Sequence, residues 1–243
     1  MKQHLIKTSK QLFDLLHDYK NSTAWIFRGQ KDASWEVLPK AGRKEFALKY
    51  QGGITEKSMF ESWKRYAIHF MNATPDDEWD WLALAQHHGL ATRLLDWSKS
   101  PLNAAFFAVD SNQGQDAAIY AFETLTQEFV SESDPFHVKD LKIYYPKGLS
   151  ARIISQRGIF TISASPTNPI DKQLGARLHK FIIDGSTTSD IKQTLEFFGI
   201  NAMSIYQDLD HLSEYLNSFV QSTDRKPMNP PLPPLPPEKP PFG

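Results

Sequence analysis

The chain has 243 residues, with 27 basic and 28 acidic side chains, a net charge of -1 and no cysteine. The absence of cysteine excludes disulfides, thiolate catalysis and cysteine-rich zinc sites. The balanced charge creates no overall field that would attract nucleic acid or an anionic membrane, so nucleic acid is not an expected partner. Aromatic residues are plentiful enough to form a large core, with sixteen Phe, eight Tyr and six Trp.

The first 16 residues lack the continuous apolar stretch of a signal peptide. Nor does any stretch of the sequence approach the about 20 apolar residues that a membrane-spanning helix needs. We therefore expect a cytoplasmic protein without a membrane partner.

Apolar periodicity and capping residues predict helices in the first half of the chain, at 8–19, 43–50, 56–71 and 76–88. Aromatic and β-branched residues predict a short strand at 23–28, which Gly29 ends. Residues 92–95 are expected to be extended. Ser100 followed by Pro101 predicts the start of a helix that runs to about Val109.

The second half mixes strands and helices. Strands are predicted at 117–123, at 177–183 and on both sides of Gly158 within 150–163, helices at 187–198 and 209–220, and a loop at 132–140. Strands and helices do not alternate regularly, so a doubly wound sheet is not required. We expect one α+β domain over residues 1–222, with a mixed, curved β-sheet flanked by helices.

Residues 223–243 form a proline-rich tail, which cannot form helices or sheet ladders because proline lacks the backbone N–H. A disordered or polyproline II tail is expected. Residues Pro230–Lys239 contain a Pro-x-x-Pro pattern, which proline-binding modules recognise. The tail is either an extended linker or the docking segment for a protein partner.

Arg28 is the first candidate site residue. It ends the apolar strand, on the face opposite Phe27, and precedes the flexible pair Gly29-Gln30. A guanidinium at the end of a strand can bind a phosphate or carboxylate with two hydrogen bonds. The same side chain can instead pair with an internal Asp and hold the sheet together, and the residues alone leave both interpretations open.

A second cluster of polar side chains runs from Gln86 to Ser98 between two apolar helices. Buried polar groups need partners, so this density of polar groups points to a site. Arg93 and Asp96 either form a buried ion pair or face a ligand. His87 and His88 would point about 100° apart on a helix, which does not suit one metal ion, so no metal is expected.

Gln156 and Arg157 precede Gly158 between two predicted strands. They form either a third wall of the cleft or an ordinary turn. The sequence contains no Walker loop, no Gly-x-Ser-x-Gly elbow and no His-Glu-x-x-His motif. The common phosphate-binding and hydrolase motifs therefore do not identify the reaction.

Three stretches together resemble the FRG domain family, named for its Phe-Arg-Gly motif: residues 25–30, 85–98 and 100–108. The string Thr-Arg-Leu-Leu-Asp-Trp at 92–97 is the most specific part. Residues 156–161 and 195–212 are similar to the family's C-terminal half, so the resemblance covers residues 8–220. Ala91 stands where a proline is expected, and Ser98 where a threonine is expected.

The order of these segments also resembles ADP-ribosyltransferases of the Arg-Ser-Glu type. This resemblance implies a similar fold with NAD as substrate, Arg28 on the NAD diphosphate, and Asp96 or Gln156 in the catalytic position. Gln156 stands where that type has a glutamate and lacks the charge that would stabilise an oxocarbenium ion. The other residues expected to contact the cofactor are Gly29, Gln30, His88, Thr92, Arg93 and Ser98.

Two functions of different classes follow from these residues. The first is an NAD-consuming enzyme or ADP-ribosyltransferase, acting in a bacterial toxin or anti-phage system. The second is a non-catalytic module that binds a nucleotide or another small anion and whose tail recruits a protein partner.

Overall fold

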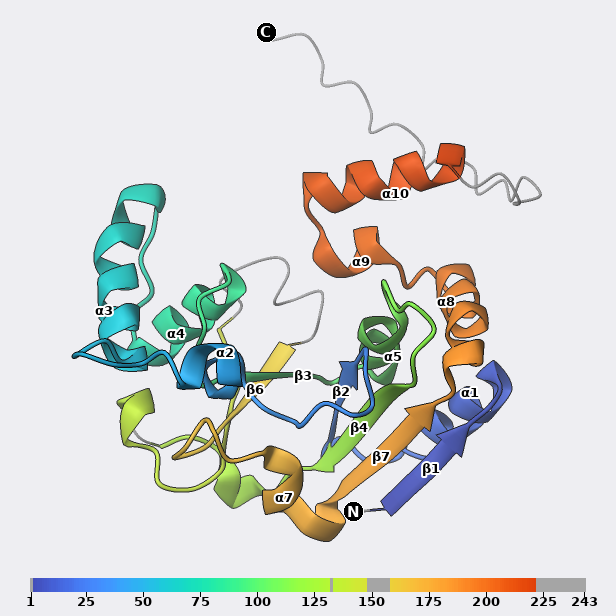
Figure 1. The fold of residues 1–243 in the computed structure, drawn as a ribbon, viewed down its shortest axis with the longest axis horizontal. Coiled ribbons are helices and arrows are strands. Elements are labelled where there is room, and N and C mark those ends of the chain that lie inside the picture. Colours follow the sequence, from blue (N-terminus) through green and yellow to red (C-terminus); the bar gives the residue numbers. More distant parts are fainter. Residues whose placement is uncertain (1, 132, 148–157, 222–243) are drawn as a thin grey trace, which may run out of the picture.

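The structure, a computed structural model, describes residues 2–131, 133–147 and 158–221 (Figure 1). This part of the chain contains a seven-stranded sheet with the order β1-β7-β4-β2-β3-β6-β5. β1 and β7 are parallel, whereas the other neighbouring strands are antiparallel. The predicted α+β class with a mixed sheet is confirmed. The strands are β1 (Lys2–Ile6), β2 (Trp25–Gln30), β3 (Leu95–Ser98), β4 (Ala117–Glu123), β5 (Lys142–Tyr144), β6 (Gly158–Ile162) and β7 (Leu178–Ile183).

Helices flank this sheet and form two groups in Figure 1, with α3 and α4 beside β6 and with α1, α5 and α8 beside β2, β4 and β7. A 3-10 turn, η1 (Lys40–Gly42), precedes α2. The described helices are α1 (Ser9–His17), α2 (Lys44–Ala47), α3 (Glu56–Ala67), α4 (Glu78–His87), α5 (Pro101–Val109), α7 (Ile170–Leu174), α8 (Thr188–Phe197), α9 (Ala202–Tyr206) and α10 (Leu209–Gln221).

Helix boundaries follow the capping residues that the sequence shows. The Thr8 side chain accepts a hydrogen bond from the backbone N–H of Gln11, and Ser100 accepts one from Asn103. Such caps satisfy N–H groups that have no partner inside the helix. The predicted helices at 8–19 and from Pro101 to Val109 are therefore found as α1 and α5.

Other predictions need correction. The extended segment predicted at 92–95 is a strand at Leu95–Ser98, because the backbone before it bonds to side chains and loops instead: Arg93 N donates to Glu56, and Thr92 O accepts from Ala41 N. The short elements β1, β5, α7 and α9 were not predicted. The first of the two strands expected around Gly158 lies outside the described residues, as does the proline-rich tail.

Strand β2 contributes to the hydrophobic core on both faces of the sheet. Phe27 packs with α1, α5 and α8, whereas Ile26 packs on the other face with Val37, Trp97 and Tyr120. This arrangement confirms the predicted alternation, in which Arg28 shares a face with Ile26.

Gly29 allows α5 to approach β2 closely. A Cβ atom at this position would lie 2.0 Å from the carbonyl oxygen of Ala104 and 2.6 Å from the backbone nitrogen of Ala108. Gly29 lies in regular extended backbone and pairs with Ile119 of β4. The sequence suggested that this glycine provides flexibility, whereas its structural role is to leave room for the helix.

The sheet opens between β2 and β3. β2 pairs with β4 at six positions, from Trp25 to Gln30, but it pairs with β3 only at Phe27↔Ser98. Figure 1 shows β3 running across the direction of β4 and β7. The two strands separate beyond their single pair, and this separation creates space beside Arg28.

We predict that Gly29→Ala lowers the free energy of unfolding by about 3 kcal/mol or more, because no side-chain rotation can move the backbone atoms that the new methyl group meets. Urea denaturation measures this loss. Gly52→Ala is the control: a Cβ there meets nothing within 4 Å, although φ is +62°. The control should cost about 1–2 kcal/mol, and equal costs for the two variants would contradict the packing role of Gly29.

Candidate functional site

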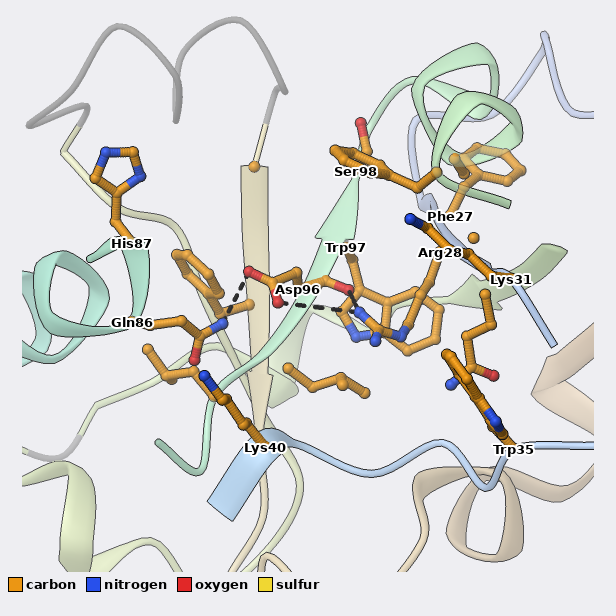
Figure 2. A pocket seen from close by; sticks show the side chains of 18 of the residues that line it. Phe27, Arg28, Lys31, Trp35, Lys40, Gln86, His87, Asp96, Trp97 and Ser98 are labelled. Carbon is orange, nitrogen blue, oxygen red and sulfur yellow. Dashed lines mark hydrogen bonds and ion pairs between the residues drawn. The ribbon is translucent and has the colours of Figure 1, made fainter. Parts of the chain in front are cut away.

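A cavity of about 530 Å³ lies where β2 and β3 separate (Figure 2). Its walls come from β2, β3, the C-terminal end of α4, the segment 31–43, one face of α5 and the start of β6. Small-molecule sites in proteins have volumes of about 300–1,000 Å³. The cavity is therefore large enough for a nucleotide-sized ligand.

Arg28 bridges the two separated strands. Its NH1 atom donates a hydrogen bond of 2.7 Å to the backbone carbonyl of Asp96 and lies 4.0 Å from the Oδ2 atom of that residue. The Nε atom is buried, and no group in the described part of the chain forms a hydrogen bond with it. Burial lowers the pKa of Arg28, the nearby Asp96 opposes this shift, and the charge of Arg43 adds to it. Arg28 and Asp96, two candidate residues from different parts of the sequence, thus lie opposite one another across one cavity.

Two side chains behind Asp96 hold its carboxylate. Gln86 Nε2 donates to Asp96 Oδ1 at 2.8 Å. The hydroxyl of Thr92 donates in turn to Gln86 Oε1. Thr92 is almost fully buried and does not line the cavity, so it reaches the site through Gln86. The interaction expected from Thr92 is therefore indirect.

A basic wall that the sequence patterns did not predict shares the cavity with Asp96. Lys31, Lys40 and Arg43 line the cavity together with Trp35, whose residue surface is 51% exposed. η1 is tied to the segment before β3, since Lys40 Nζ donates to the carbonyl of Gly89 at 2.8 Å. The segment 31–43 has little regular secondary structure, and its sequence contains no known binding motif. Three cations around one tryptophan were its only sequence signal.

The charges of this wall are largely uncompensated. Arg28 and these three residues place four cations on the cavity, and Asp96 is the one carboxylate among its described lining residues. Within residues 2–131, 133–147 and 158–221, no carboxylate forms an ion pair with Lys31, Lys40 or Arg43. The site is therefore suited to an anion.

The remaining candidate residues divide into two groups. Gly29, Gln30 and Ser98 line the cavity, as expected of contact residues. His88 does not: it is exposed at the end of α4, and its ring stacks on Trp63 with centroids 6.3 Å apart. The neighbouring His87 lines the cavity instead. Gln156 lies outside the described residues.

Arg93 lies away from the cavity and binds Glu56. Its NH2 atom lies 2.9 Å from Glu56 Oε2, its Nε bonds to both carboxylate oxygens, and its guanidinium lies 4.6 Å from the ring centre of Phe136. Burial raises the pKa of Glu56, and the hydrogen bonds from Arg93 oppose this shift. Neither alternative for Arg93, an ion pair with Asp96 or a contact to a ligand in the cavity, is found, because Arg93 forms a structural ion pair between α3 and the segment before β3.

The described residues show no cluster of three or more His, Asp or Glu side chains that could hold a metal ion. They also contain no helix that is long and apolar enough to cross a membrane.

We predict that Glu56→Ala and Arg93→Ala each lower the free energy of unfolding by about 3–5 kcal/mol, since each leaves a buried charge without its partner. The double variant should cost much less than the sum. Urea denaturation of all three variants tests this coupling. Lys10→Ala is the control, because its ion pair with Asp14 is exposed and should contribute about 0.5 kcal/mol or less. Additive losses would show that the two residues act separately.

Comparison with known protein families identifies part of the chain. Residues 23–117 match the model of the FRG domain. This segment contains the bridging residue Arg28, the basic wall and the whole Thr92–Gln86–Asp96 arrangement. No curated protein and no solved structure matches the chain. The resemblance to the FRG domain that the motifs showed is confirmed over residues 23–117, which match the model of that domain.

Proposed function

We propose that this FRG domain binds an anionic nucleotide of the NAD type in the cavity between β2 and β3. The observation that carries this proposal is the set of four cations, Arg28, Lys31, Lys40 and Arg43, which line one cavity without a matching number of carboxylates. A dinucleotide brings a diphosphate with two negative charges, which cations in such a position stabilise.

The two arginines favour a phosphate-bearing ligand in particular. The Arg28 side chain is 12% exposed, and the charge of Arg43, which lines the same cavity, lowers the pKa of Arg28. Like charges in such an environment repel one another, and an anion between them removes that cost. Guanidinium groups also match the geometry of phosphate oxygens.

Trp35 supports the nucleotide part of the proposal. Trp35 is half-exposed and lines the same cavity as Lys31 and Gln30. A base can stack on such a ring and gain about 1–3 kcal/mol. Cations for the phosphates and a ring for the base are thus present on one wall.

We predict that wild-type protein binds NAD and that Arg43→Gln weakens binding about 10- to 100-fold, through loss of one charged hydrogen bond. Isothermal titration calorimetry at two salt concentrations measures this change. Arg65→Gln is the matched control, since it removes the same charge from an exposed position on α3. Arg28→Lys keeps the positive charge but removes the guanidinium group, so its affinity for NAD shows how much binding depends on the geometry of that group. Its melting temperature shows whether the variant is still folded. Absence of NAD binding to folded wild-type protein would refute the proposal.

Asp96 favours a second candidate, cleavage of NAD. Its side chain is 64% exposed within the cavity and is held by Gln86. In hydrolysis, the bond between ribose C1′ and the pyridinium nitrogen breaks, and its electron pair neutralises that nitrogen. Water adds to C1′ and releases a proton. A carboxylate near C1′ stabilises the positive charge that develops there.

This second candidate predicts that the wild-type protein releases nicotinamide from NAD and that Asp96→Asn loses at least about 100-fold in rate while it still binds NAD. Chromatography of the products measures the rate, and calorimetry measures the binding. Binding by the wild type without release of nicotinamide would leave the cavity with a binding role alone.

A further inference from the structure

We propose that Thr92 and Gln86 are positioning residues that fix the carboxylate of Asp96 so that it selects a ligand with a ribose hydroxyl next to its phosphates. This inference rests on the proposed nucleotide binding and adds to it the group on the ligand that Asp96 recognises. Both residues lie in the stretch 85–98, and in this scheme both act on the ligand through Asp96.

The orientation of the Gln86 amide is determined by its neighbours. The Thr92 oxygen accepts a hydrogen bond from the backbone N–H of Leu94 at 3.3 Å, and the Thr92 hydroxyl donates to Gln86 Oε1. The amide nitrogen of Gln86 must then face the opposite way, toward Asp96 Oδ1 at 2.8 Å. Because a carboxylate oxygen can only accept, this is also the favourable choice at the other end.

Asp96 is consequently held at one oxygen and open at the other. Gln86 occupies Oδ1, and the hydrogen bond from Arg28 goes to the backbone carbonyl of Asp96 rather than to the carboxylate. Oδ2 lies 4.0 Å from Arg28 NH1, too far for a hydrogen bond. In the part of the chain that is described, Oδ2 has no hydrogen-bond donor. Figure 2 shows the carboxylate between Gln86 and Arg28.

The carboxylate of Asp96 among the cations of the cavity limits which ligands bind well. Asp96 repels phosphate oxygens, so it weakens the binding of any anion that offers only phosphates at this position. It accepts hydrogen bonds from hydroxyl groups, and a hydrogen bond to a charged acceptor is stronger than one between neutral groups. The cavity therefore suits a ligand with a hydroxyl beside its phosphates, which is the arrangement in a ribonucleotide.

The test compares the binding of NAD with that of two analogues, one lacking the 2′-hydroxyl of the adenosine ribose and one lacking that of the nicotinamide ribose. We expect one analogue to bind the wild-type protein about tenfold more weakly than NAD, and the analogue affected identifies the ribose that Asp96 contacts. Equal binding of all three compounds would overturn the inference and leave nucleotide binding intact. Absence of binding by NAD itself would instead refute the proposed function.

The positioning role is tested with a matched pair of variants at the buried position 92. Thr92→Val removes the hydroxyl with little change in shape, so the Gln86 amide is held only by its bond to Asp96 and positions the carboxylate less firmly, and the tenfold preference for NAD should fall to about twofold or less. Thr92→Ser keeps the hydroxyl and should keep the preference. A role in stability alone would weaken NAD and the affected analogue equally. An unchanged ratio in Thr92→Val, with Asp96→Asn as the reference that abolishes it, would overturn the inference.

Discussion

The hydrogen bond from Arg28 to the backbone of Asp96 joins two strands at the point where the sheet opens. β2 and β3 pair at one position only, and the guanidinium spans the gap at 2.7 Å. The same gap is the cavity, so the group that holds the strands together also lines the site. A structural role and a binding role for Arg28 are therefore compatible, since NH1 serves the sheet while the positive charge of the group remains available to a ligand.

The Phe-Arg-Gly motif combines three different requirements in consecutive residues. Strand alternation places Phe27 and Gly29 on the face that α5 covers and Arg28 on the other. Phe27 fills the core under the helix, and Gly29 leaves room for the backbone of Ala104. Close packing of α5 on β2 thus fixes the strand from which Arg28 projects. Two of the three residues in the motif, Phe27 and Gly29, therefore serve the packing of α5 on β2.

The sequence predicted what depends on neighbouring residues and failed where distant residues decide. Caps such as Ser100 mark helix starts locally, so α5 was found, whereas β1 has few buried side chains and forms a strand through its pairing with β7. Arg93 was assigned to the site because it lies beside Asp96 in the chain. Its partner Glu56 is 37 residues away. Acidic residues are common in the first turn of a helix, where they interact favourably with the helix dipole, so Glu56 gave no sign of a distant partner. The basic wall from Lys31 to Arg43 has no periodicity from which its position could be inferred.

The overall charge of -1 conceals a local difference between arginines: Arg93 and Arg177, away from the cavity, have carboxylate partners, whereas among the described residues Arg43, at the cavity, has none. Arg93 is matched by Glu56 and Arg177 by Glu128, whereas Arg43 stands near Arg28 and adds to its repulsion. An anion that enters between the two arginines would remove this repulsion at the junction of β2 and β3. Ligand binding should therefore stabilise the sheet where it is weakest, which couples occupancy of the site to the stability of the fold.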